Sequence, residues 1–151
     1  MKLTPSKLNT FSMLKLPSAY LCGVRVKHID DEKCKVSVKH RWINQNPFKS
    51  MFWAVQGMAA EFSTGALMMS KIQISGKRIS MLVTSNQARF TKKATGRIHF
   101  TCQDGHLIDE VVRKAVETGE GQTVDLKSVG IDEIGDEVST FTFEWSIKVK
   151  S

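Results

Sequence analysis

The stretch that decides the fold is residues 50–70, which read SMFWAVQGMAAEFSTGALMMS and contain a single ionisable side chain, Glu61. A helix that crosses a membrane needs about 20 mostly apolar residues, but the glutamine, serines, threonine and glycines make this segment too polar for lipid. Its large apolar side chains recur at helical spacing: Met51, Val55, Met58, Phe62 and Met69. The segment therefore predicts a long helix enclosed by protein on nearly all sides. We expect Asn46 and Pro47 to supply its cap and its first-turn proline.

Segments with a period of two flank this helix on both sides. The first two, separated by an acidic turn, predict strands with one buried face each, formed by Cys22, Val24, Val26 and His28 and by Cys34, Val36, Val38, His40 and Trp42. Four more strand-like stretches follow the helix, at residues 79–90, 97–102, 122–129 and 140–149. Shorter helices are expected at residues 4–16 and 106–118.

This order predicts an α+β fold, in which an antiparallel sheet of five to six strands wraps around one long central helix. The 151 residues suffice for one domain with a substantial core. We expect that domain to span residues 1–151, with residues 1–18 as an N-terminal helix or arm. Hydrophobic residues make up 41% of the chain and charged residues 25%, which argues against a disordered protein.

The sequence contains no pattern typical of a metal or cofactor site. Its cysteines, Cys22, Cys34 and Cys102, are odd in number and widely spaced, so we expect reduced core side chains in a cytoplasmic protein. The four histidines show no zinc-ligand spacing. Lysines interrupt residues 1–17, so no signal peptide is expected there.

The formal net charge of +7 favours a negatively charged partner. Nucleic acid is one candidate, and a phosphorylated small molecule such as coenzyme A is another. The aromatic residues Phe141, Phe143 and Trp145 alternate as a core face does, rather than forming a basic stacking surface for bases. We therefore expect neither a nucleic-acid partner nor a membrane partner.

The residues around the long helix resemble the thioesterase superfamily with the hotdog fold. Residues 46–61, NPFKSMFWAVQGMAAE, resemble its loop and central helix, and residues 61–65, EFSTG, resemble its acidic-x-x-x-glycine motif. Residues 86–90 with the turn at 92–96 resemble its strand pair joined by a basic, glycine-closed turn. The resemblance covers residues 20–150. It is nearest to a bacterial branch related to phenylacetyl-CoA-type thioesterases and to the domain attached to some acetyltransferases.

The resemblance implies an acyl-CoA thioester hydrolase that works as a homodimer or tetramer, with acyl-thioester grooves at the subunit interface. Coenzyme A would be part of the substrate, and no other cofactor is expected. Glu61 is the expected catalytic carboxylate, as a general base for water or as a nucleophile. The helix start near Asn46 and Ser50 is expected to hold the thioester oxygen. The expected substrate-binding residues are Phe52, Trp53, Gln56, Thr64, Arg89, Lys92, Lys93 and Arg97.

One departure from the family pattern keeps other functions open. The phenylacetyl-CoA type carries His-Gly-Gly at the helix start, whereas this chain has Phe52-Trp53-Ala54. A non-catalytic hotdog protein that binds an acyl group or a lipid is the alternative. A dehydratase or hydratase of the same fold is a third possibility, and it would require a histidine beside Glu61. A carboxylate that holds a lysine of a second chain is the structural alternative for Glu61 itself.

Overall fold

The computed structural model describes residues 2–151 and contains six strands and one long helix, α3, at Trp53–Ser75. The strands are β1 (Arg25–Ile29), β2 (Cys34–Lys39), β3 (Ile79–Phe90), β4 (Arg97–Cys102), β5 (Gln122–Ile131) and β6 (Glu137–Val149). They form one antiparallel sheet in the order β1-β2-β4-β5-β6-β3. The predicted α+β architecture is confirmed.

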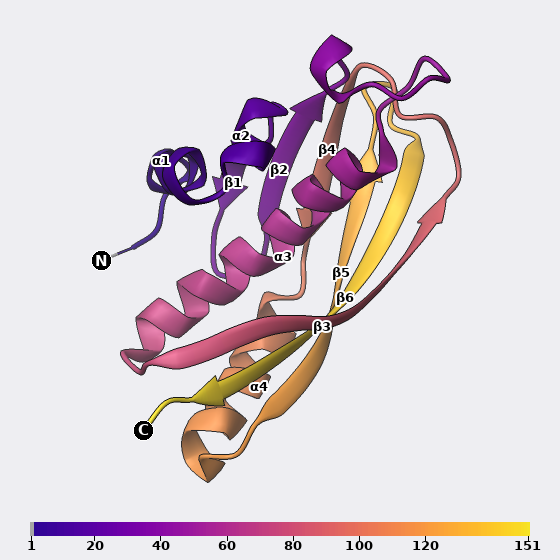
Figure 1. The fold of residues 1–151 in the computed structure, drawn as a ribbon. Coiled ribbons are helices and arrows are strands. Elements are labelled where there is room, and N and C mark those ends of the chain that lie inside the picture. Colours follow the sequence, from indigo (N-terminus) through magenta and orange to yellow (C-terminus); the bar gives the residue numbers. More distant parts are fainter. Residues whose placement is uncertain (1) are drawn as a thin grey trace.

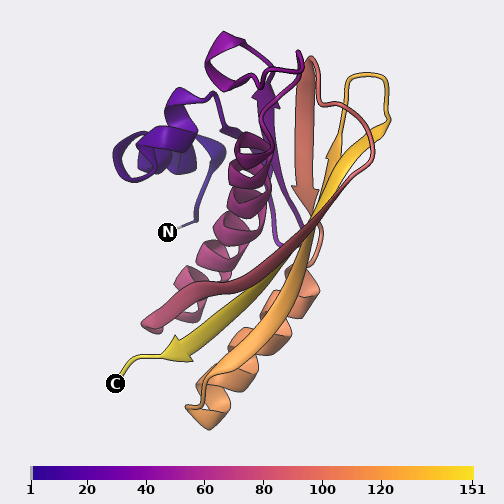
Figure 2. The same ribbon diagram turned by 45° about the vertical axis from the view of Figure 1, so that its right-hand side comes forward.

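The remaining helices surround α3 and the ends of the sheet. Helices α1 (Pro5–Lys15) and α2 (Pro17–Leu21) lie beside α3, on the same side of the sheet and near β1 (Figures 1 and 2). Helix α4 (Gly105–Thr118) lies at the opposite end of the molecule from the 3-10 turn η1 (Trp42–Asn44) (Figure 1). The helices expected at residues 4–16 and 106–118 are thus present.

Helix α3 is held by small residues that let it approach the sheet closely. The ring of Phe141 lies 3.5 Å from the point where a Cβ on Gly57 would stand, and the ring of Trp145 lies 3.3 Å from that point on Gly65. Much of the helix is fully buried, including Ala59, Ala60, Ala66, Leu67 and Met68. The helix ends at Gly76, whose φ of 69° suits the left-handed C-terminal cap. The prediction of a helix enclosed by protein is confirmed.

The predicted start of α3 is wrong. Phe52 is the N-cap residue, without a side-chain hydrogen bond, and the helix begins at Trp53. Asn46 and Pro47 lie in the preceding loop, where Gln45 forms an isolated antiparallel bridge with Met51. Asn46 therefore organises a loop rather than capping a helix.

Two of the expected buried faces extend too far. Strand β2 ends at Lys39, and Trp42, in η1, is 82% exposed. The cause is Asn44, whose amide donates hydrogen bonds to the carbonyls of Cys22 (3.0 Å) and Lys39 (2.9 Å) and turns the chain out of the strand.

His28 is exposed because β1 has a bulge between Val26 and His28, which takes the two residues off a common face. Cys22 lies at the end of α2 and is partly exposed, whereas Cys34 and Cys102 are buried on paired strands. His40 follows the end of β2 and is half-buried. The prediction that the cysteines lie in strands is thus confirmed for Cys34 and Cys102 and wrong for Cys22.

Strand β3 forms one edge of the sheet, and its outer edge is unpaired within residues 2–151. Twelve residues long, it pairs with β6 along its whole length, with one irregularity between Val83 and Ser85. All residues from Thr84 to Phe90 are exposed. Natural proteins seldom leave so long an edge open to water.

None of the helices in residues 2–151 is long and apolar enough to cross a membrane.

Candidate functional site

Glu61 lies near the middle of α3 and borders a pocket of about 500 Å³. The pocket lies between α3, the α1–α2 segment and the strands β3 and β6, and its lining is mostly apolar. Three methionines and an indole line the same pocket: Met58, Met69, Met81 and Trp145. The outer wall comes from Phe11 and from residues 15–19. We call this the Glu61 pocket.

In the single chain Glu61 as a residue is exposed to solvent. Protein atoms around its carboxyl group nevertheless remove part of the water that would solvate the charge. Burial raises its pKa above the ordinary 4.5, and no charged or hydrogen-bonding partner within residues 2–151 contributes to the shift. A carboxylate with a raised pKa and no partner is a better base for a water molecule than an ordinary surface glutamate.

A buried hydrogen-bond chain fixes the floor of the Glu61 pocket. The indole Nε1 of Trp145 donates to the hydroxyl of Thr64 at 2.9 Å, and that hydroxyl donates to the carbonyl of Glu61 at 2.8 Å. Thr64 has no exposed surface and does not line the pocket. The expected contact of Thr64 with a ligand is therefore corrected: this residue positions Trp145 against α3.

A second pocket, of about 620 Å³, lies at the start of α3. We call it the loop pocket. It gathers most of the expected site residues: Asn46, Ser50, Phe52, Trp53, Gln56, Lys92 and Lys93. Phe48 and Phe90 add to its apolar lining. The sequence had linked these residues to Glu61, yet Glu61 does not border the loop pocket.

Asn46 is fully engaged inside its own loop. Its Oδ1 accepts hydrogen bonds from the N–H groups of Phe48 (2.8 Å) and Ser50 (3.2 Å), and its Nδ2 donates to the Ser50 hydroxyl at 2.9 Å. Ser50 is buried. Both residues therefore shape the wall of the loop pocket.

The start of α3 adjoins the loop pocket, which Phe52, Trp53 and Gln56 line. The N–H groups of Trp53 and Ala54 are the first of the helix, so they have no acceptor within it, and Phe52 supplies no capping side chain. The Oε1 of Gln56 accepts a hydrogen bond of 2.7 Å from the buried hydroxyl of Ser139, which leaves the amide N–H groups for a ligand. These donors and the helix dipole suit a carbonyl oxygen that acquires negative charge.

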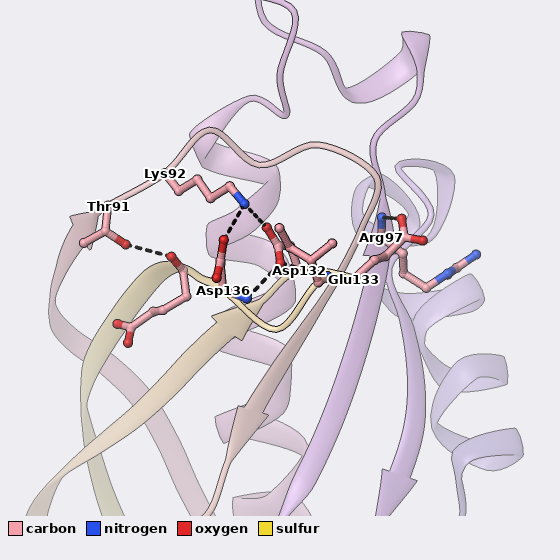
Figure 3. A network of polar contacts seen from close by, with 8 residues as sticks. Thr91, Lys92, Arg97, Asp132, Glu133 and Asp136 are labelled. Carbon is pink, nitrogen blue, oxygen red and sulfur yellow. Dashed lines mark hydrogen bonds and ion pairs between the residues drawn. The ribbon is translucent and has the colours of Figure 1, made fainter.

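The basic turn does not act as one cluster. Lys92 forms ion pairs with Asp132 at 2.7 Å and Asp136 at 2.8 Å (Figure 3). These two carboxylates, which belong to the loop between β5 and β6, neutralise much of its charge. Lys93 lies beside the loop pocket and donates to the Phe48 carbonyl at 3.3 Å.

The two arginines of the basic turn do not line the loop pocket. Arg97 lies on β4, where its guanidinium donates to Ser37 of β2, and Arg89 is exposed on β3. Within residues 2–151 the four charges therefore do not line one pocket, and their contact with coenzyme A stays a prediction.

The sequence did not identify several residues of the Glu61 pocket. Trp145 and Met81 belong to alternating strands, and Phe11 to a segment with only loose periodicity. Such patterns indicate burial or a helix, but they do not show that a pocket remains beside Glu61. Within residues 2–151, no group of His, Cys, Asp and Glu side chains could hold a metal ion.

Solved structures show the same fold. A protein of Pseudomonas aeruginosa of unknown function, named a probable thioesterase, matches with a TM-score of 0.82 and 20% identity over 99% of both chains. A mutant thioesterase of the same organism matches with a TM-score of 0.77 and 14% identity, covering 99% of this chain and 97% of the other. A Haemophilus influenzae thioesterase matches with a TM-score of 0.76 and 10% identity, covering 99% and 93%.

These matches confirm the predicted hotdog fold. No curated protein matches the chain. A family model described as "Domain of unknown function (DUF4442)" matches residues 6–147, and the chain therefore belongs to the DUF4442 family.

Proposed function

We propose that this protein hydrolyses an acyl thioester of coenzyme A, in a site that two copies of the chain build together. The observation that carries the proposal is Glu61, an unpartnered carboxylate whose pKa is raised by burial at the edge of an apolar pocket. The names of the structural neighbours support this class of reaction, since two of them are thioesterases.

The separation of the two pockets supports a dimeric site. In one chain the polar donors of the loop pocket and the carboxylate of Glu61 belong to different cavities. The unpaired edge of β3 borders both regions, because Met81 lines the Glu61 pocket and Phe90 lines the loop pocket. Antiparallel pairing of β3 with β3 of a second copy would bring each Glu61 pocket toward the partner's loop pocket.

The chemistry follows from these groups. Glu61 takes a proton from a water molecule, and the water oxygen forms a bond to the thioester carbon. The carbonyl electron pair moves to its oxygen, which is stabilised by the loop pocket of the second copy, through the helix-start N–H groups and the amide of its Gln56. The pair then returns, the C–S bond breaks, and the thiolate takes the proton from Glu61. The products are a carboxylic acid and coenzyme A.

The Glu61 pocket is suited to the acyl group. Thioether side chains adapt to irregular shapes, so the three methionines favour a flexible apolar chain over a rigid polar group. Lys93 at the loop pocket is the cation best placed for the charged part of coenzyme A, because Lys92 is already paired.

A non-catalytic acyl-binding protein is the second candidate. The observation that favours it is Asn46, whose side chain is consumed by its own loop, together with Phe52-Trp53-Ala54 in place of His-Gly-Gly. Such a protein would keep the apolar pocket and lack turnover.

Release of free thiol from a panel of short, medium, long and aromatic acyl-CoA thioesters tests the proposal. We expect turnover by the wild type and a loss of at least about 100-fold in Glu61→Gln, the scale of losing a general base. Glu120→Gln is the matched control, because Glu120 is exposed and lines neither pocket. Binding of the acyl-CoA without turnover would instead establish the second candidate.

A further inference from the structure

The positive charge of this protein is concentrated in its first part. Residues 1–60 contain ten lysines and arginines and three acidic residues, whereas residues 61–151 contain twelve of each kind. The whole formal net charge of +7 therefore arises from residues 1–60. In the fold these residues form α1, α2, β1, β2, η1 and the start of α3.

Several of these charges meet on the outer face of β2 and β4. Val36, Val38, Ile98 and Phe100 point into the core, so the residues between them point outward. The register places Lys39 opposite Arg97, Ser37 opposite His99 and Lys35 opposite Thr101. We call Lys27, Lys35, Lys39, Arg97 and His99 the outer-face cluster.

Local contacts hold the cluster in place. The guanidinium of Arg97 donates a hydrogen bond of 3.2 Å to the hydroxyl of the buried Ser37 across the strand pair. Glu133 is the acidic residue that faces the cluster, and its carboxylate accepts a hydrogen bond of 2.7 Å from the backbone N–H of Arg97. Within residues 2–151, none of the cluster's lysines nor Arg97 forms a salt bridge.

The cations act on one another and on His99. Burial lowers the pKa of His99 below its ordinary 6.5, and Lys35, Arg97 and Lys27 lower it further, while Glu133 acts in the opposite sense. Like charges directly opposite each other on a sheet are also destabilising, as in the Lys39 and Arg97 pair. The face thus carries a positive potential that an anion would relieve.

On this face of β2 and β4, Lys39 is exposed, whereas Lys35, Arg97 and His99 are half-buried. The long helix α3 packs on their inner face, and α1 packs on β1. A groove of about 460 Å³ lies over β4 and β5, lined by Thr101, Gln103, Asp104, Lys127, Val129 and Ile131. Ile131 lies opposite His99 in the register, so cluster and groove are adjacent.

We propose that the outer-face cluster is a binding site for the phosphate groups of a small ligand, separate from the proposed thioesterase site. The cluster contains four side chains with a permanent positive charge: Lys27, Lys35, Lys39 and Arg97. One carboxylate would neutralise only one of these charges, whereas a diphosphate carries several negative charges. The Arg97 guanidinium and the lysine ammonium groups provide donors for phosphate oxygens, while the buried Ser37 hydroxyl holds the guanidinium in place. The adjoining groove, with Val129 and Ile131, can hold an apolar or planar part of the same molecule.

An NMR titration of the histidine Hε1 signals with inorganic pyrophosphate, at constant ionic strength, tests the site. We expect the pKa of His99 to rise by about 1 unit as the anion offsets the surrounding cations. His106, which is exposed on α4, should not respond. A His99→Gln variant assigns the signal. An unchanged pKa of His99, or equal shifts of all four histidines, would overturn the proposal.

Variants distinguish a site from a general charge effect. In Lys35→Gln/Arg97→Gln the pKa of His99 should start higher and no longer respond to pyrophosphate. Lys77→Gln/Lys150→Gln removes the same charge near the β3 edge and should keep the response. An equal loss in both pairs would refute a local site. A short single-stranded oligonucleotide that shifts His99 at lower concentration than adenosine diphosphate would overturn the assignment to a small ligand. None of these titrations measures hydrolysis, so their result is independent of the proposed enzyme activity.

Discussion

The indole N–H of Trp145 donates a hydrogen bond to the hydroxyl of Thr64 at 2.9 Å, although the two residues lie 81 positions apart. Both side chains are buried, and the same hydroxyl binds the carbonyl of Glu61. This contact joins β6 to the turn of α3 that carries the candidate catalytic carboxylate. It therefore couples the stability of the fold to the shape of the Glu61 pocket.

Thr64→Val should lower the free energy of unfolding by about 1–3 kcal/mol, because it leaves a buried indole N–H without an acceptor. Urea denaturation measures the loss. Thr10→Val is the matched control: the Thr10 hydroxyl also donates to a backbone carbonyl one helical turn earlier, but it is exposed. We expect that change to stay within about 0.5 kcal/mol. Equal losses in the two variants would contradict the assigned role of Thr64.

Glu61→Gln should raise the melting temperature near neutral pH while it removes activity. The pKa of Glu61 is raised in the folded protein, so folding favours the protonated form, and the wild type loses stability as pH rises from the ordinary 4.5 through the raised value. A glutamine carries no such cost. Thermal melts at a series of pH values should show no difference below pH 4.5, a growing one as the pH rises to the raised pKa, and a constant one above it. A variant less stable than the wild type at neutral pH would show that Glu61 has a stabilising partner.

Mixing two inactive variants should restore activity if each site draws on two chains. The Glu61→Gln variant lacks the carboxylate but keeps an intact loop pocket. The Asn46→Ala variant loses the side chain that shapes the loop pocket but keeps Glu61. When the two variants are unfolded and refolded together, half of the dimers should contain one chain of each. One of the two sites in such a dimer is intact, so we expect about a quarter of the wild-type rate. Asn46→Ala mixed with Ser50→Ala should recover nothing. Failure of the first mixture to exceed the second would place the complete site within one chain.

The open edge of β3 should mediate the association of two copies. We expect the wild type to show twice the 16.9 kDa mass of one chain in light scattering. Leu82→Glu should shift the population toward the single chain, because the 65% exposed Leu82 lies on this edge strand and the change brings like charges together across the two-fold axis. Ile134→Glu, on the loop between β5 and β6, is the control. A monomeric wild type would remove the basis of the composite site.

Much of the fold could be predicted because its strongest patterns are local. The alternation from Phe141 to Val149 lies in one strand, β6, and the enclosed helix is visible in the apolar character of residues 53–70. The errors occur where a distant residue intervenes. The alternation continues through Trp42, but the Asn44 amide binds the carbonyls of Cys22 and Lys39 and ends the strand earlier.

The candidate site was predictable in part for the same reason. Glu61 stands out as a lone charge in an apolar helix, and the helix-start residues do gather in one pocket. The charge state of the basic turn depends on Asp132 and Asp136, which are 40 and 44 residues away from Lys92. The Glu61 pocket likewise depends on how α1 and α2 pack beside α3. The spacing of apolar residues along the sequence does not predict this packing.

The methionine lining of the Glu61 pocket has a consequence for the lifetime of the protein. Met58, Met69 and Met81 are all partly exposed, so peroxide can reach their sulfur atoms. Conversion to sulfoxides would put polar, hydrogen-bonding groups where an alkyl chain is meant to lie. The fully buried Met51 and Met68, which support the core, are shielded from this damage. Oxidative ageing should therefore remove the binding of apolar acyl groups long before it unfolds the protein.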